Sequence, residues 1–325
     1  EINLSLGPAG ELRYPSYNAH DSNTGYPTRG ALQAYSDLAV ASFREFVRKK
    51  YGSLDNVKKA WNFELGSFES IQPPNPSLME NFFAKGEHFS PYGKDFFDWY
   101  NQSLIRHAET MFLLAERVFG TKSSAMKNVP LGGKMPGVHW LTGSTRLAEL
   151  AAGLIRTSYP DWYSDEGGFG YRETLKAFRQ RSHMKHVIHF TAIELNDMDH
   201  EGSLPVFSRA KTLTQRIGKA VAALRSEDPG MKGISLKGEN ALSHTLHDGG
   251  AWDNMVTALK TMGYDGVTLL RLNELIGDLR AQFGKLLARG GALDRSGGCR
   301  IGGLREGQGE QQGKAEQGRF HDRVS

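Results

Sequence analysis

The chain has 325 residues, and its 40 lysines and arginines nearly balance 36 aspartates and glutamates, which gives a formal net charge of +4. This small excess is no electrostatic footprint for nucleic acid, so we expect no nucleic-acid partner. No apolar run approaches the roughly 18 residues that a membrane span requires, so we expect no membrane partner. The single cysteine, Cys299, excludes an intramolecular disulfide and a cysteine-based zinc site.

Strand-like and helical patterns alternate along most of the chain. Residues 2–6 alternate polar and apolar with no signal peptide before them, so we expect the chain to begin inside a fold. Further strands are predicted at Ala125–Leu131, His186–Ile193, Gly233–Leu236 and Gly266–Leu270. Helices are predicted at Arg29–Tyr51, Tyr92–Phe119, Tyr171–Arg181, Ser208–Arg225, Trp252–Met262 and Glu274–Leu287. This alternation of strands and helices predicts a parallel sheet.

The chain changes character after Leu287. Residues 1–287 carry the alternating pattern and supply only some of the eight strands of a closed (β/α)₈ barrel. Residues 288–325 are rich in glycine and charge and poor in large apolar residues, so we predict a disordered tail. Two origins stay open for this tail: a flexible linker, and translation past a truncated gene end.

The candidate chemistry follows the predicted strands, because functional side chains of α/β barrels lie beyond the carboxyl ends of the strands. The first strand leads into Glu11 and Tyr17, the second into Lys134 and Trp140, and the fourth into Glu239. Two carboxylates among aromatic residues suggest a glycosidase. Cleavage of a glycosidic bond needs one carboxylic acid to protonate the leaving oxygen and a second carboxylate to attack or to activate water. Taken singly, each glutamate is more simply a solvated loop residue.

Two loops give these glutamates a more specific context. Gly7–Tyr17 resembles the catalytic-acid signature of the β-amylases, and Gly238–Leu242 resembles their catalytic-base signature. Segments that resemble the family in the same order are Gly137–Trp140, Ala148–Gly153, Phe190–Glu194 and Leu270–Leu272, while Asn18–Gln33 resembles its bacterial branch. The resemblance implies an α/β fold, a (β/α)₈ TIM barrel of the β-amylase type that is incomplete, with strands that correspond to the fourth to the eighth.

This resemblance implies an inverting hydrolase that removes β-maltose from the non-reducing ends of starch and related α-1,4-glucans. Glu11 would be the general acid and Glu239 the general base, with roughly 6.5–9.5 Å between their carboxyl groups. The expected substrate-binding residues are Tyr17, Lys134, His139, Trp140, Thr191, Asn240, Ala241 and Arg271. Lys134 would help to hold the glucan near Glu11, Thr191 would lie on a mobile inner loop, and Asn240 would orient Glu239.

Several family features fall outside this sequence or differ from it. The three strands before the acid motif, with their lid and its aspartate, and the C-terminal starch-binding module have no counterpart here. We expect no cofactor and no metal, because a calcium site of the bacterial branch would lie mostly in the absent part. The resemblance also implies a secreted, extracellular protein. Ala192 stands where the family usually has cysteine, and Arg146-Leu147 where it tends to have His-Ala.

Two alternative functions stay open. One is a catalytically inactive fragment with at most weak glucan binding, whose open sheet would leave two exposed edges. The other is a barrel glycosidase with a retaining mechanism, whose carboxylates would stand roughly 5 Å apart.

Three other patterns are assigned no function. Asp197–Gly202 matches the first half of an EF-hand loop, but the twelfth position holds a serine where a glutamate is required. His183, His186 and His189 recur at every third residue, and the side chains of a strand alternate between faces, so these three cannot converge on one metal. The four aromatic residues between 96 and 100 fit the buried face of a helix.

Overall fold

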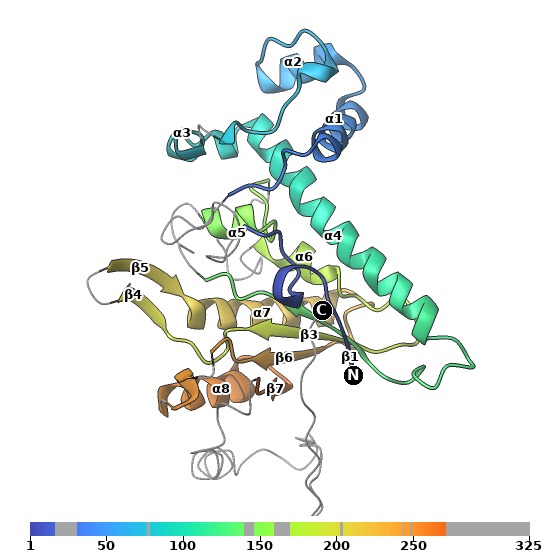
Figure 1. Ribbon diagram of the computed structural model, residues 1–325, viewed down its shortest axis with the longest axis vertical. Helices are drawn as coiled ribbons and strands as arrows, with labels where there is room; N and C mark the ends of the chain where they lie inside the picture. The colour runs from blue at the N-terminus through green and yellow to red at the C-terminus, as the bar shows by residue number, and fades with distance from the viewer. Residues whose placement is uncertain are drawn as a thin grey trace, which may run out of the picture. The chain divides into compact units, whose positions relative to one another are not determined.

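The computed structural model describes residues 1–16, 31–76, 79–139, 146–158, 170–201, 204–242, 244–247 and 249–270, all of which belong to one compact unit, Glu1–Ala292. The described part contains a parallel sheet with the strand order β1, β2, β3, β6, β7 (Figure 1). These strands are β1 (Ile2–Leu4), β2 (Leu131–Met135), β3 (His186–Thr191), β6 (Ser235–Glu239) and β7 (Gly266–Thr268). Each neighbouring pair is parallel, as the alternating pattern predicted.

Helices separate most of the strands along the chain. They are α1 (Asp37–Tyr51), α2 (Leu54–Trp61), α3 (Met79–Ala84), α4 (Pro91–Phe119), α5 (Leu147–Ala151), α6 (Arg172–Lys176), α7 (Ala210–Glu227) and α8 (Gly249–Thr261). The helix predicted from Arg29 begins only at Asp37, because the Ser36 side chain accepts a hydrogen bond from the backbone N–H of Ala39 and caps the helix there. None of the described helices is long and apolar enough to cross a membrane. The predicted helix Glu274–Leu287 and the predicted tail lie outside the described residues.

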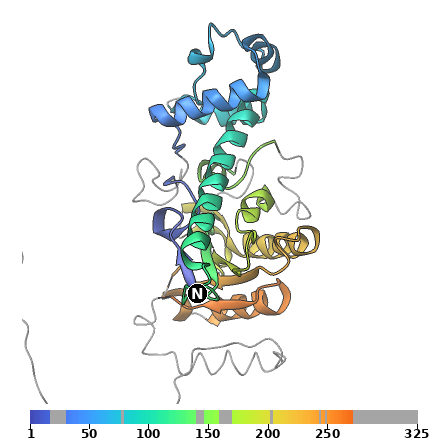
Figure 2. The same ribbon diagram turned by 90° about the vertical axis from the view of Figure 1, so that its right-hand side faces the viewer.

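The longest helix, α4, connects the sheet region with α1 and α2 (Figure 2). Ser90 caps its first turn and Pro91 occupies the first helical position, where a missing N–H costs nothing. The predicted burial of the four aromatic residues is confirmed, since Phe96, Phe97, Trp99 and Tyr100 are all buried. Phe43 of α1 packs against Phe96 edge to face with 5.5 Å between ring centroids, so aromatic contacts join the two helices.

Two predicted strands were misplaced. Residues 125–130 form turns and an irregular segment, and β2 begins at Leu131 instead of ending there. The prediction places Gly132 and Gly133 after the end of this strand, but both lie inside β2, where a side chain at Gly133 would overlap Leu6 and Phe178. The strand predicted at Gly233–Leu236 is in fact Ser235–Glu239, so Glu239 belongs to the strand and not to the loop that follows it.

The two faces of the sheet differ in character, because successive side chains of a strand point to opposite faces. On one face Ile188 and Leu236 are fully buried, and the ring of His186 lies 4.7 Å from that of Phe112 in α4. The polar residues of the other face include Lys134, His189, Thr191, Lys237 and Glu239. His186 and His189 therefore lie on opposite faces, as the strand period requires.

An antiparallel hairpin, β4 (Asp197–Glu201) and β5 (Leu204–Arg209), was not predicted. Asp197 accepts hydrogen bonds from the backbone N–H of Thr212 at 3.1 Å and from its hydroxyl at 2.5 Å. The first acidic residue of the EF-hand-like segment is thus engaged with the first turn of α7.

Candidate active site

The first candidate carboxylate, Glu11, follows a short 3₁₀ turn, Pro8–Gly10, at the carboxyl end of β1. Ala9 and Gly10 have φ values of 56° and 78° in this turn, a left-handed backbone that alanine adopts only at a cost. The turn places Glu11 in a parallel bridge with Lys134, and the backbone N–H of Leu12 donates to the carbonyl of Lys134 at 2.8 Å. Glu11 therefore lies beside the end of β2.

Two donors fix the carboxylate of Glu11. The buried guanidinium of Arg13 donates from Nε to Oε2 at 2.8 Å. The Thr191 hydroxyl donates to Oε1 at 3.1 Å and accepts a hydrogen bond from the backbone N–H of Gly137 at 2.7 Å. Three strand ends therefore meet at this one side chain.

The second candidate carboxylate, Glu239, ends β6 and is only 1% exposed. The ammonium of Lys134 lies 2.9 Å from its Oε2, and Nδ1 of His189 lies 3.2 Å from its Oε1. Burial by itself would raise the pKa of Glu239, but its contacts with His189 and Lys134 outweigh burial and lower this pKa below its usual value. Glu239 is thus held ionised, as a base must be.

The structure brings four of the predicted residues together. The backbone of Lys134 is paired with Glu11 while its ammonium contacts Glu239, and Thr191 is the register partner of Glu239 in the sheet. The lysine expected near Glu11 therefore connects the surroundings of both glutamates. The positive charge of the Lys134 ammonium offsets the negative charge of the nearby Glu239 carboxylate.

The loop after β6 is held differently from the prediction. The side-chain amide of Asn240 accepts from the backbone N–H of Leu270 at 2.6 Å and donates to the carbonyl of Leu242 at 3.3 Å. It thus ties the loop to the end of β7, whereas Lys134 and His189 contact the Glu239 carboxylate. The backbone N–H of Ala241 is also engaged, since it donates to Glu194 at 2.9 Å.

The remaining predicted residues divide into two groups. His139 is buried, and its Nδ1 lies 2.6 Å from the Ser208 hydroxyl at the end of the hairpin. Tyr17, Trp140 and Arg271 lie outside the described residues. Tyr14, another aromatic of the acid motif, is no exposed platform for a sugar, because its ring stacks on that of Tyr100 with centroids 4.2 Å apart.

Sequence reasoning missed residues that support the two glutamates. Arg13 lay within the acid motif but received no role, and His189 was read only as a strand residue. A usable signal was present, because His189 with Thr191 and Lys237 with Glu239 are each two residues apart in a strand and must share a face. Glu194 had no such signal, since it lies in a loop.

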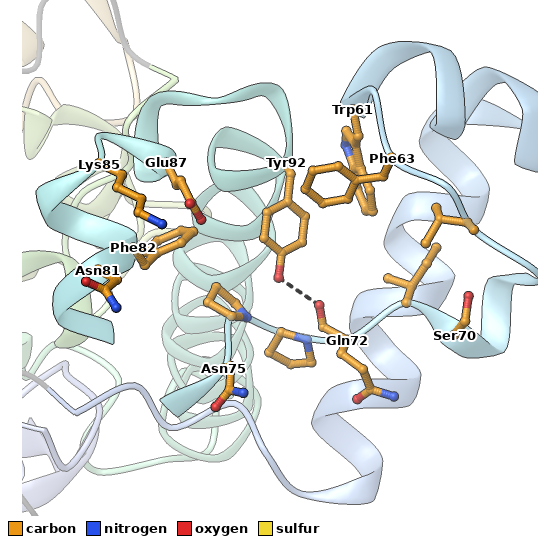
Figure 3. A pocket seen from close by; sticks show the side chains of 14 residues that line it. Trp61, Phe63, Ser70, Gln72, Asn75, Asn81, Phe82, Lys85, Glu87 and Tyr92 are labelled. Carbon is orange, nitrogen blue, oxygen red and sulfur yellow. Dashed lines mark hydrogen bonds between the residues drawn. The ribbon is translucent and has the colours of Figure 1, made fainter. Parts of the chain in front are cut away.

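A separate pocket of about 460 Å³ lies among α2, α3 and the start of α4 (Figure 3). Trp61, Phe63 and Tyr92 line it with their rings, and the Tyr92 hydroxyl donates to the carbonyl of Gln72 at 2.8 Å. None of the predicted site residues that the structure describes lines this pocket. Nor do the described residues contain a group of three or more histidine, cysteine, aspartate or glutamate side chains placed to hold a metal ion.

The chain is similar to known beta-amylases. A beta-amylase from Bacillus cereus is 38% identical over 289 residues, which are 88% of this chain and 46% of that protein. A beta-amylase from Cytobacillus firmus is 32% identical over 286 residues, 88% of this chain and 54% of that protein. The chain thus spans about half the length of these curated relatives.

The solved catalytic domain of a beta-amylase from Paenibacillus polymyxa matches with a TM-score of 0.69 and 31% identity, over 89% of this chain and 62% of that one. This match confirms the predicted fold class, an incomplete (β/α)₈ barrel of the β-amylase type. The family model of Glycosyl hydrolase family 14 matches residues 1–288. The chain is therefore a member of Glycosyl hydrolase family 14.

Proposed function

We propose that this chain carries the catalytic acid and base of a β-amylase. It would hydrolyse α-1,4-glucosidic bonds of starch and related glucans from the non-reducing end and release β-maltose with inversion. The observation that carries the proposal is the linked pair of glutamates, in which Thr191 contacts Glu11, Lys134 contacts Glu239, and all four lie at the carboxyl ends of strands.

The proposed reaction assigns one proton transfer to each glutamate. Glu11 in its protonated form donates to the glycosidic oxygen as the bond from that oxygen to the anomeric carbon breaks. Glu239 as carboxylate takes a proton from the water whose oxygen bonds to the opposite face of that carbon. The products are β-maltose and a glucan shorter by two glucose units. The lowered pKa of Glu239 supports its role as the ionised partner.

The neighbouring cations complement the charge that this reaction creates. Proton donation leaves a carboxylate on Glu11, and the Arg13 guanidinium at 2.8 Å stabilises that negative charge without having to move. The Thr191 hydroxyl, 3.1 Å from the other oxygen, donates a second hydrogen bond to it.

The glucan contacts and the location are proposals of the same kind. The proposed substrate-binding residues are Tyr17, Lys134, His139, Trp140, Thr191, Asn240, Ala241 and Arg271. Lys134 can contact a sugar hydroxyl while it stays beside Glu239, because its ammonium is part-exposed and has three N–H donors. The proposed partner is starch or a maltooligosaccharide, and the proposed location is extracellular.

The test is maltose release from maltoheptaose by the 325-residue chain. We expect Glu11→Gln and Glu239→Gln each to lower kcat by roughly 10²–10⁴-fold, the range of general acid–base catalysis. Glu64→Gln is the matched control, because Glu64 is exposed on the loop after α2. Full activity in either active-site variant would show that the assigned role is wrong.

One observation favours a second candidate, a fragment without activity. In the described part of the chain β1 and β7 are edge strands with no outer neighbour, and edges of this kind favour association with other chains. This candidate predicts oligomers that release no maltose. Sedimentation and thermal unfolding test it: a monomer that unfolds cooperatively and releases maltose contradicts it.

A further inference from the structure

The imidazole of His189 lies between two carboxylates on the polar face of the sheet. Its Nε2 contacts Oε1 of Glu1, and its Nδ1 lies 3.2 Å from Oε1 of Glu239. The second oxygen of Glu1 accepts a hydrogen bond from the ammonium of Lys237 at 2.7 Å. With Lys134 on the far side of Glu239, five charged groups of alternating sign form one row.

This arrangement fits the charged form of the imidazole. Neutral histidine carries no charge, whereas the imidazolium is attracted by both carboxylates: its Nε2 is hydrogen-bonded to Glu1, and its Nδ1 makes an ion-pair contact with Glu239 that lacks hydrogen-bond geometry. His189 is 2% exposed, and burial alone would lower its pKa, but its contacts with Glu1 and Glu239 outweigh burial and raise this pKa. Burial likewise opposes ionisation of Glu1, yet His189 and Lys237 lower its pKa to about 2.

A glycine makes the contact between Glu1 and His189 possible. The strand β2 lies between β1 and β3, so the Glu1 side chain must pass over β2 to reach His189. It passes at Gly132, where a Cβ atom would overlap Oε1 of Glu1 and Oδ1 of Asn3. Gly132 thus leaves the space that the Glu1 carboxylate occupies.

We propose that His189 is a positioning residue for Glu239: its imidazolium, anchored by Glu1, holds Oε1 of Glu239 while Lys134 holds Oε2. The carboxylate is then fixed in one orientation from both sides. The proposal rests on the proposed role of Glu239 as the base. The bridge that Glu1, His189 and Glu239 form can, however, be measured without catalysis.

The bridge makes a definite prediction for pH. The charged groups that face His189 and its partners are Glu1 from β1, Lys134 from β2, and Lys237 and Glu239 from β6. Loss of the His189 proton at alkaline pH removes one of the two cations from Glu239. Removal of His189 by mutation therefore raises the pKa of Glu239 and moves the acid limb of its pH profile upward.

The first experiment follows the histidines of the 325-residue chain by NMR titration. His186 is the internal control on the same strand, because its burial lowers its pKa. We expect His189 to titrate above, and His186 below, the ordinary histidine pKa of about 6.5. Glu1→Gln should lower the pKa of His189 by about one unit, and Gly132→Ala should lower it without removing any charge. Glu45→Gln, on the exposed face of α1, should leave it unchanged. Titration of His189 below 6.5, or no response to Glu1→Gln, overturns the bridge.

The second experiment tests the effect on Glu239. The side-chain carboxyl carbon of Glu239, titrated by NMR, should show a pKa raised by about one unit in His189→Gln, which keeps a donor but loses the charge. In the pH profile of kcat/KM on maltoheptaose the acid limb should move in the same direction, with KM little changed. An unchanged Glu239 titration overturns the positioning role. A wild-type chain that releases no maltose would count against the proposed function. The two NMR titrations would then decide whether His189 positions Glu239.

Discussion

Glu194 offers a sharp test of how the loop beside the proposed base is held. Its carboxylate is 1% exposed, and Oε1 accepts from the backbone N–H groups of Ala241 and Leu242, both at 2.9 Å. The Thr245 hydroxyl donates to the same oxygen at 3.3 Å. Because Ala241 and Leu242 follow Glu239 within three residues, loss of Glu194 should release the segment that carries the base.

The magnitude follows from the groups left without an acceptor. In Glu194→Ala two backbone N–H groups lose their partner, at about 1–3 kcal/mol each where water cannot reach them. Leu242 is 41% exposed and its N–H can turn to water, so we expect a total loss of about 3 kcal/mol in the free energy of unfolding. For a unit of this size that loss lowers Tm by roughly 6–12 °C. Glu194→Gln keeps one acceptor oxygen and should lose about half as much.

Thermal unfolding followed by circular dichroism measures these losses, with Glu64→Ala as the exposed control. The pH dependence adds a second check. Burial raises the pKa of Glu194 although the backbone donors of Leu242 and Ala241 oppose it, so the folded state holds this proton more tightly than the unfolded state. The extra stability that comes from this tighter proton binding is complete below the unfolded pKa and is lost as the pH rises through the folded pKa. A Tm for Glu194→Ala within about 1 °C of the wild type would refute the reasoning.

Two further predictions concern packing around the sheet and around α4. Gly137→Ala should lower the free energy of unfolding by about 1–3 kcal/mol and reduce activity, because the new Cβ would overlap the Thr191 backbone that positions the hydroxyl on Glu11. Urea unfolding measures this loss of stability, and Gly66→Ala, where a Cβ meets open space, is the control. Equal stability of the two variants would contradict the prediction. Asp95→Asn should lower the free energy of unfolding by about 2–4 kcal/mol, because the buried carboxylate accepts hydrogen bonds from Lys50, from the Tyr51 hydroxyl at 2.6 Å and from Trp61 Nε1 at 2.7 Å. Trp61 fluorescence during denaturant unfolding measures this loss. An unaltered denaturation midpoint would contradict the prediction.

Periodicity predicted the parts of the fold that depend on burial. The strands β1, β3 and β7 and the long helix α4 appear where apolar residues alternate or recur at helical spacing, whereas β2 and β6 lie further along the chain than predicted. Strand ends then placed Glu11, Lys134, Thr191 and Glu239 near one another, since parallel strands bring their carboxyl ends to one edge.

The errors have a common physical origin in contacts between segments distant in sequence. Gly132 and Gly133 follow the predicted strand, yet they lie in β2, where Glu1, Leu6 and Phe178 occupy the space that side chains would fill. The hairpin β4–β5 was missed because a two-stranded insertion has no helix to mark it. Because Asn240 follows Glu239 in the sequence, its side-chain amide was expected to orient the Glu239 carboxylate. The amide oxygen instead accepts a hydrogen bond from the backbone N–H of Leu270, at the end of β7.

The bridge at His189 shows what alternation alone leaves undetermined. The strand period places His189 on the same face as Thr191, and Lys237 on the same face as Glu239. It does not show that Glu1 crosses β2 to reach His189, since that contact depends on the absence of a side chain at Gly132.

The central claim is that Glu11 and Glu239 act as an inverting acid and base, and the anomeric form of the product tests it most directly. Proton NMR during the first minutes of maltoheptaose hydrolysis by the 325-residue chain should show β-maltose appearing first and the α anomer only later, by mutarotation. First appearance of α-maltose would contradict the account and favour a retaining mechanism, with carboxylates roughly 5 Å apart. No maltose at all would contradict the activity proposed for this chain.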